Sequence, residues 1–547
     1  MIDKILGAIH VAESQADGLK RMAQLLTGIS KISDQEVERL LTEAASMSTA
    51  SDLSPIPDQD GNWKTRLDLL IPVVQALLVR EVKLAKEARK KSVGGELEAS
   101  QKTENASAWS EGLHQAVDTL YFATPPDSEL RCHLLQWLAL GCQDKRLKHW
   151  VQLLTDEAPE HRSSIALAFA PLMDASVVPP EWLLDDLIAS ATGYSQIASA
   201  VYDLSNFYFR HEVIDYHPAE DKLEALDELL GQLYQNLNKI ESGQVNPNID
   251  RQVLNRQVSD SVALMVSLCD TFALTRYEPA SEHIAQAMSL RHRRVQTEAA
   301  AALARLGHEE GREALIALVK DPVSRLRVLA YADEQGFLDQ ISLEYQGEIA
   351  IAESRLAIWL AEPDQMGLAP SRIELLESRE MYWPSYEHPI VCYLFRFWYG
   401  SSENAYNNVG ICGPMTHALS ADMNHLSHDD LYAAFAGWQT THQEIFYLAV
   451  PQAEQLYASE MRRLNGVMLE QEIEDLAIET AASFFGEIIL IGRGTLDGVI
   501  GTAIADQRDI TWIPENNEAA PIDSGLAFSL WCGRKLLSAF NQEDQLA

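Results

Sequence analysis

The chain has 547 residues, 47% of them hydrophobic, and its 80 acidic against 43 basic residues leave a net charge of −37. This length exceeds what one ordinary core holds, so we expect roughly two to four folded domains. The negative surface repels phosphate backbones and anionic lipids. It therefore argues against nucleic acid or a membrane as partner and favours a basic protein.

The residues near the N-terminus predict neither a membrane span nor a secretory signal. The longest apolar stretch there, residues 69–79, is interrupted by Gln75, and a transmembrane helix needs about 20 apolar residues. The first residues also lack a basic segment followed by a cleavage site. The six cysteines are scattered without a CxxC pair. They are typical of reduced thiols, and we expect a cytoplasmic protein.

The first two thirds of the chain are predicted to be helical. Residues 1–91 form an N-terminal group of helices, in which Ser33 and Glu36 have the spacing of a capping box. Residues 92–108 are polar and glycine-containing, which is typical of a linker. In residues 109–362, short apolar helices alternate with breaks, and we predict antiparallel helical pairs stacked in a row.

The clearest internal repeat lies within residues 284–336. Each copy has a small residue inside a helix and a glycine at the helix end, Ala299 and Gly307 in the first copy and Ala330 and Gly336 in the second. Small residues let paired helices approach closely. We therefore expect both alanines to be buried at a helix contact.

Three further features of this segment suggest a family. Asp321-Pro322-Val323 forms a tight turn into a helix, Arg327 follows it, and Leu306-Gly307 ends the preceding helix. With these residues the segment resembles a HEAT repeat, in the short form of the phycobilin-lyase-like group. The resemblance implies an α-solenoid, in which each helical pair covers the apolar face of its neighbour. A non-repeating helical bundle is the alternative.

Residues 365–547 are predicted to form a separate α+β domain, for which no family resemblance is identified. In residues 389–399 both alternating faces are apolar, so this strand is expected to be central and covered on both sides. Arg396 is the exception, and it forms a structural ion pair, lies at an edge position or binds an anion. A mostly antiparallel sheet is expected. The other predicted strands are 408–412, 444–450, 487–491, 498–505 and 508–513, and the predicted helices are 427–438, 451–464, 470–485 and 524–540.

An aromatic loop supplies the candidate binding residues. The loop runs from Met381 to Tyr386 and contains Trp383. Aromatic residues and arginine are enriched at binding hot spots, so Trp383, Tyr386 and Arg396 are the predicted binding residues. The competing interpretation is that the loop covers the sheet or packs on the last solenoid helix, near Trp359.

No catalytic or metal site is predicted. Cys412, His417, His425 and His428 have side chains that bind zinc, but their spacing fits no zinc motif. As a nucleophile and base, Cys412 and His417 lack an identifiable orienting group. Gly492-Arg493-Gly494 is interpreted as a β-turn rather than a phosphate-binding loop. We therefore expect neither a metal nor a cofactor.

These patterns favour a non-catalytic protein-interaction scaffold whose partner is another protein. Stacked helical pairs form extended concave surfaces, and the chain has no catalytic signature. The alternative is an enzyme or enzyme-associated protein that handles a small molecule through the C-terminal domain. The resemblance to the lyase-like repeats implies a chromophore or similar ligand in that case.

Overall fold

A computed structural model describes most of the chain as two compact units, Met1–Ala314 (unit 1) and Leu315–Ala547 (unit 2). The described residues of unit 1 are helical apart from one short hairpin, and unit 2 combines helices with two larger antiparallel sheets. The fold is therefore mainly α with a C-terminal α+β part, as predicted. Residues outside the description are 27–28, 30–31, 50–53, 58–62, 94–109, 141–144, 158, 160–163, 175–186, 188–194, 245–248, 363–364, 401–404, 445, 449, 485–486, 507, 516–522 and 542–547.

The first part of unit 1 is a helical group around one core that contains the buried Trp137 and Trp150. The predicted capping box is confirmed: the Ser33 backbone N–H donates to Glu36 Oε2 at 2.8 Å, and the Glu36 N–H donates to Ser33 Oγ at 3.3 Å. The predicted linker lies, from residue 94 onward, outside the described residues. The elements are α1 (Ile2–Val11), α2 (Gln15–Ala23), α3 (Asp34–Thr49), β1 (Ile56–Pro57), β2 (Trp63–Lys64), α4 (Ile71–Val93), α5 (Glu111–Ala123), α6 (Glu129–Leu140), α7 (Lys145–Asp156) and α8 (Ser164–Phe169).

The second part of unit 1 has its own core, built by longer helices that include the buried Phe272 and Leu303. Helix α12 packs against α10, α11 and α14, and α13 packs against α11 and α14. No described helix of either unit is both long and apolar enough to cross a membrane. The elements are α10 (Ser195–Arg210), α11 (Leu223–Glu241), α12 (Arg251–Leu274), α13 (Ser281–Met288), α14 (Arg293–Leu306) and α15 (Glu309–Leu318), which continues into unit 2.

The glycines of the internal repeat end α14 and α16 (Pro322–Glu334) in the same way. Both have a left-handed backbone, with φ of 97° at Gly307 and 74° at Gly336. The residue after each glycine donates its N–H to a carbonyl five residues back, at 3.0 Å for His308 and 2.9 Å for Phe337. This pattern is the Schellman helix ending. The predicted turn before α16 is also confirmed, because Asp321 accepts from the Val323 N–H at 3.1 Å.

One expectation for the repeat was wrong, because Ala299 is buried whereas Ala330 is exposed. Counted back from the two glycines, the residue equivalent to Ala299 is Val328, which is buried. Ala330 lies two positions further along, about 200° around the helix. The two helices are therefore aligned correctly by the glycines at their ends. Matching Ala299 with Ala330 shifted the alignment by two residues.

Unit 2 continues with α17 (Leu343–Gln346) and α18 (Glu348–Ala361), followed by two meandering sheets. The first sheet has the order β3-β4-β5-β6, and the second has the order β11-β10-β9-β8-β7. Each sheet is followed by a long helix. The remaining elements are β3 (Arg372–Met381), β4 (Ile390–Tyr399), β5 (Tyr406–Cys412), β6 (His417–Ala418), α19 (His428–Glu444), β7 (Phe446–Leu448), α20 (Val450–Leu469), β8 (Glu474–Phe484), β9 (Glu487–Leu496), β10 (Val499–Ala505), β11 (Ile510–Pro514) and α21 (Ser524–Phe540).

The prediction for the strand at 389–399 is confirmed. Strand β4 lies between β3 and β5. One face, with Phe395, shares a buried cluster with Leu356 of α18, and the other, with Leu394, shares one with residues of α19 and α21. The prediction of a helix at 470–485 was wrong, because this segment is strand β8. Two register irregularities interrupt the β8–β9 pairing, and they hide the period of two in the sequence.

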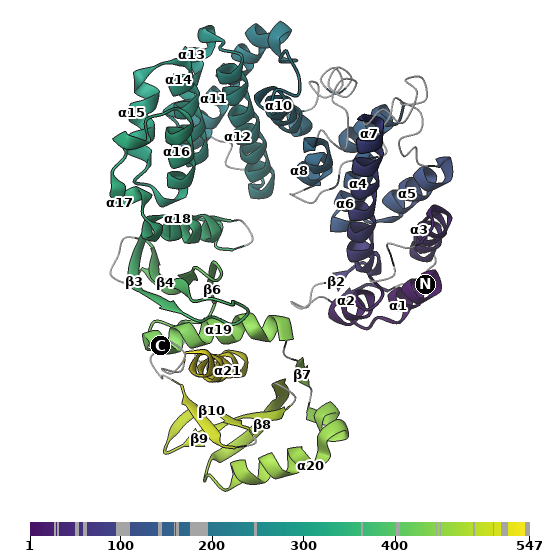
Figure 1. Cartoon of the computed structure of the whole chain (residues 1–547), viewed down its shortest axis with the longest axis vertical. Helices are drawn as coiled ribbons and strands as arrows, with labels where there is room; N and C mark the ends of the chain where they lie inside the picture. Colours follow the sequence, from purple (N-terminus) through teal and green to yellow (C-terminus); the bar gives the residue numbers. More distant parts are fainter. Residues whose placement is uncertain are drawn as a thin grey trace. The chain divides into compact units, whose positions relative to one another are not determined.

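Unit 2 contains a structural repeat that the sequence pattern did not reveal. The series α18-β3-β4-β5-β6-α19 has the same order as α20-β8-β9-β10-β11-α21. The pairing of β4 with β5 also matches the pairing of β9 with β10, because Arg396 lies opposite Val409 in the first pair and Arg493 lies opposite Thr502 in the second. Helices α19 and α21 lie together between the two sheets (Figure 1). We call the two series the first and second repeat of unit 2.

The two central helices meet through equivalent glycines. A Cβ atom on Gly437 of α19 would lie 1.7 Å from the backbone oxygen of Ser529, and one on Gly533 of α21 would lie 1.7 Å from that of Ala433. Any side chain larger than hydrogen would push the helices apart at either position. The contact is reciprocal, so the two repeats face each other with approximate twofold symmetry.

Candidate functional site

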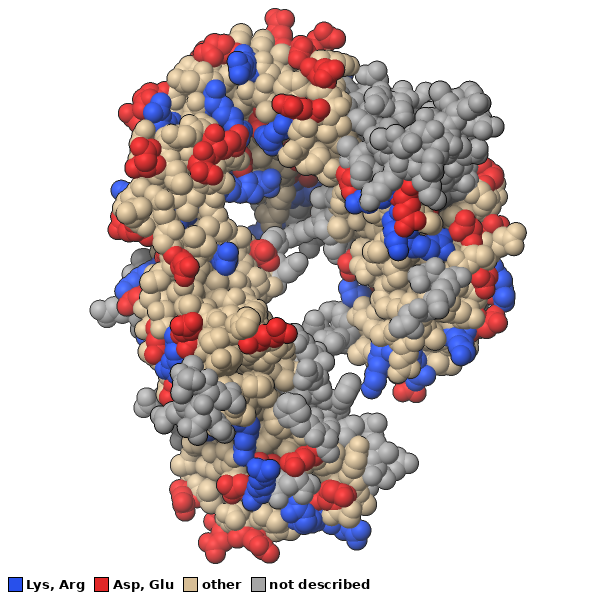
Figure 2. Space-filling model, in the orientation of Figure 1, with Lys and Arg blue, Asp and Glu red and all other residues tan. Residues whose placement is uncertain are grey.

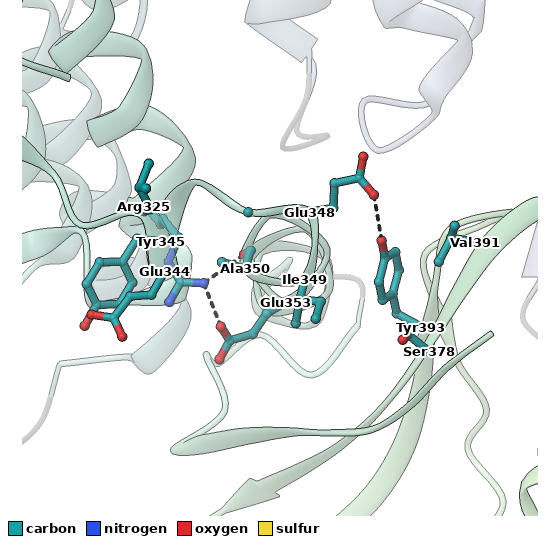
Figure 3. A pocket seen from close by; sticks show the side chains of 12 residues that line it. Arg325, Glu344, Tyr345, Glu348, Ile349, Ala350, Glu353, Ser378, Val391 and Tyr393 are labelled. Carbon is teal, nitrogen blue, oxygen red and sulfur yellow. Dashed lines mark hydrogen bonds and ion pairs between the residues drawn. The ribbon is translucent and has the colours of Figure 1, made fainter. Parts of the chain in front are cut away.

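Unit 2 has an open pocket of about 650 Å³ beside the first turn of α18. Its walls come from four places: α16 with Arg325, α17 with the turn into α18, the start of α18 itself, and strands β3 and β4 (Figure 3). The side chains around it are charged, aromatic and aliphatic. The lining residues are Arg325, Leu343, Glu344, Tyr345, Gly347, Glu348, Ile349, Ala350, Glu353, Ser378, Val391 and Tyr393.

The wall formed by α17 is held in place by local hydrogen bonds. Gln346 donates its side-chain amide to the carbonyl oxygens of Ile341 at 2.7 Å and Leu338 at 3.2 Å. Gly347 then begins α18 with an extended backbone and no side-chain cap. These contacts fix the direction of the turn, so Leu343, Glu344 and Tyr345 lie at the pocket.

Arg325 of α16, which lines the pocket next to Tyr345, has a structural role. Its guanidinium is buried and donates to Glu353 Oε2 at 2.6 Å, to the Ala350 carbonyl at 2.8 Å and to the Val319 carbonyl at 3.0 Å. The Tyr345 ring lies 5.4 Å from it. Since a buried charge needs such pairing, Arg325 ties α16 to α18 and its charge is used within the fold.

The remaining charge of the pocket is negative. Its described lining has three carboxylates, Glu344, Glu348 and Glu353, against the single guanidinium of Arg325, which leaves an excess of two negative charges. The Tyr393 hydroxyl donates to Glu348 Oε2 at 3.1 Å. Burial and then this carboxylate raise the pKa of Tyr393, so the hydroxyl keeps its proton.

Large aliphatic side chains stand exposed around these carboxylates. Leu343 is 80% exposed, Ile349 46% and Val391 37%. The described lining contains no histidine or cysteine. The arrangement can bind a group that has both an aliphatic part and a positive charge. Acidic side chains elsewhere are interspersed with lysine and arginine (Figure 2).

The second repeat of unit 2 is closed where the first has its pocket. In the first repeat Ser378 pairs with Tyr393, and in the second repeat Ala481 pairs with Leu490 at the equivalent place in the sheet. Ile488 is the residue equivalent to Val391. All three residues of the second repeat are buried, in a cluster with Met461, Leu464 and Met468 of α20. The outer helix α20 therefore seals in the second repeat the surface that α18 leaves open in the first.

The three predicted binding residues lie outside the lining of this pocket. Trp383 is buried in the core next to α19 and α21, and its indole N–H donates to Gln439 Oε1 at 2.6 Å. Tyr386 is exposed, and its hydroxyl donates to the Pro414 carbonyl at 2.9 Å. Arg396 is half-buried on the β4 face toward α19 and α21, and its Nε has no hydrogen-bond partner among the described residues. Their role in binding stays a prediction.

The cysteine and histidines considered for zinc have separate surroundings. Cys412 is buried, with its Sγ 3.5 Å from Thr416 Oγ1. The His417 ring stacks on the Trp438 ring, with 3.7 Å between the ring centroids, and its centroid lies 5.2 Å from that of the Trp359 ring. His417 is therefore an aromatic neighbour of Trp359. His428 Nδ1 is 3.2 Å from Glu377, and the described contacts give the His425 ring nitrogens no partner. Among described residues, no group of three or more such ligands is placed to hold a metal ion.

The interpretation of Gly492-Arg493-Gly494 as a β-turn was wrong. The three residues lie inside strand β9, and Arg493 forms an ion pair with Glu515. A Cβ atom on Gly494 would lie 2.5 Å from the Ile473 side chain. The glycines therefore serve close packing within the sheet.

Comparison of the chain with models of known protein families, with curated protein sequences and with solved structures found no match.

The sequence pattern did not identify Glu344, Tyr345 and Glu348 as a site. The local signal was limited to two glutamates: Glu344, within the short helix α17 that also exposes Leu343, and Glu348, the first residue of α18.

Proposed function

We propose that this chain is a non-catalytic protein-interaction scaffold and that a partner protein docks at the pocket beside α18. The observation that carries this proposal is the exposed aliphatic side chains of Leu343, Ile349 and Val391 around a group of carboxylates. Exposed apolar groups with a polar surround mark interaction surfaces.

The helical part is proposed to be a HEAT-like α-solenoid. Two observations support this: α13 packs on both α11 and α14, and α14 and α16 end in the same Schellman pattern at Gly307 and Gly336. A cytoplasmic location is proposed as well. It is supported by the five described cysteines, which are free and buried, as expected in a reducing compartment.

A small-molecule role through the C-terminal domain is the second candidate. The volume of the pocket, about 650 Å³, falls in the range of ligand sites, roughly 300–1,000 Å³. An enzyme or enzyme-associated protein of this kind would bind a metabolite there. Screening of a metabolite collection by thermal shift, with binding lost on Glu348→Gln, would favour this candidate over the scaffold.

Photo-crosslinking in the source cell tests the scaffold. Benzoylphenylalanine replaces Leu343 at the pocket or, as a matched control, Leu469, which is 64% exposed at the end of α20. A protein adduct of defined mass is expected at position 343 and not at 469. The same adducts at both positions, or none at 343 while the protein is folded and abundant, would reject docking at this pocket.

A further inference from the structure

We propose that the pocket beside α18 accepts a segment of a partner protein in which lysine or arginine stands next to apolar residues. This inference rests on the proposed function and specifies the chemistry of the partner. The occupant is a basic peptide segment because the charge of the pocket, its exposed aliphatic side chains and its contrast with the second repeat together favour a positive charge beside an aliphatic part.

The first feature is the charge that remains after internal pairing. Arg325 is bonded to Glu353 and to backbone carbonyls, so it does not offset Glu344 and Glu348. Figure 3 shows Glu348 at the start of α18, directed toward Tyr393, and Glu344 beside Tyr345 of α17. The positive end of a helix amounts to only about half a charge, which is less than two carboxylates. The pocket therefore repels anions and attracts cations.

The second feature is the arrangement of polar and apolar groups. Glu348 already accepts from the Tyr393 hydroxyl, and this bond orients its carboxylate while leaving acceptor sites free. Ile349 and Val391 expose aliphatic surface. Lysine and arginine pair methylene groups with a charged end, and they fit such a surface better than a small hydrated cation does.

The third feature is the contrast with the second repeat. There the equivalent surface is apolar at Ile488, Leu490 and Ala481 and is sealed by α20. In the first repeat a tyrosine stands where the second has Leu490, and Glu348 accepts its hydroxyl. An apolar helix would bury this carboxylate without a counter-charge, which is unfavourable. A basic segment supplies the counter-charge.

Fluorescence anisotropy with labelled hexapeptides tests this chemistry on the full chain. The probes are Gly-Leu-Lys-Leu-Lys-Gly and versions with arginine, norleucine or glutamate in place of both lysines. They are measured near 150 mM salt, where screening limits long-range attraction by the acidic surface. We expect the lysine and arginine peptides to bind the parent protein about fivefold or more tightly than the norleucine peptide.

Two variants locate the effect. In Glu344→Gln/Glu348→Gln the preference for basic peptides should disappear, whereas Glu470→Gln, at an exposed site after α20, should keep it. Circular dichroism melts confirm that both variants are folded. Equal binding of the norleucine peptide, a preference for the glutamate peptide, or an equal loss in Glu470→Gln would overturn the proposal.

The outcomes also separate this inference from the proposed function. A partner crosslinked at position 343 without any preference for basic peptides would reject the basic segment and retain the scaffold. A clear preference for basic peptides without a crosslinked protein would reject the scaffold and retain the chemistry of the pocket.

Discussion

The two repeats of unit 2 have the same order of elements and the same register, yet their outer faces differ. In the second repeat, α20 buries Ile488 and Leu490. In the first, α18 buries Phe395 and Phe397 and leaves Val391 exposed. The inner faces of both sheets are covered by α19 and α21. The comparison teaches that the contact of α19 and α21 with each other and with the two sheets is what both repeats have in common. The outer face of each sheet can become either core or binding surface.

The largest effect is expected from removing α18. A fragment that begins at residue 315 should be soluble and melt cooperatively, because it retains all the elements of unit 2. A fragment that begins at residue 365, at the boundary predicted from the sequence, lacks Leu356 and Leu360, which cover Phe395. It should aggregate or bind a hydrophobic dye. Equal solubility and equally sharp melts of the two fragments would show that α18 is dispensable.

The next effect tests the symmetry of the central contact. Gly437→Ala and Gly533→Ala each place a Cβ atom 1.7 Å from a backbone oxygen, and each should cost about 3 kcal/mol or more. Gly466→Ala in α20 is the matched control, since nothing lies within 4 Å of its Cβ position. It should be neutral or stabilise by up to about 1 kcal/mol. Urea unfolding measures all three, and a large loss in only one of the two central variants would refute the reciprocal contact.

A smaller effect compares the sealed and the open outer faces directly. Leu464→Ala removes a buried side chain of α20 and should cost about 2–5 kcal/mol. Ile349→Ala, at the half-exposed start of α18, should change stability by about 0.5 kcal/mol or less. Thermal melts of the two variants and of the parent measure both changes in stability. Similar losses would mean that the pocket is closed in solution.

The smallest effect concerns the hydroxyl of Tyr393. Tyr393→Phe removes its bond to Glu348 and should cost about 1 kcal/mol near neutral pH. Burial and the carboxylate raise the pKa of this tyrosine above its ordinary value of 10.0. The folded state therefore holds the proton longer than the unfolded state, and the parent loses this stabilisation as the pH rises above 10. Unfolding free energies at pH 8 and above pH 10 should differ more in the parent than in the variant.

The sequence predicted those elements whose pattern is local. Strand β4 was recognised because both of its faces are apolar over ten residues, and the helix ends at Gly307 and Gly336 were recognised from glycine alone. Strand β8 was missed because its irregular register breaks the alternation. The pocket was missed because Arg325, Glu348 and Tyr393 come from three separate segments, and no motif in the sequence connects them.

The reciprocal contact at Gly437 and Gly533 has the form of an isologous interface, in which two copies of one fold present the same patch to each other. Here the copies belong to one chain. The connecting segment keeps their effective concentration high whatever the concentration of the protein. A homodimer with such an interface would have to present identical outer faces. Joining the copies removes this constraint, so one outer face can be closed for stability while the other stays open for a partner.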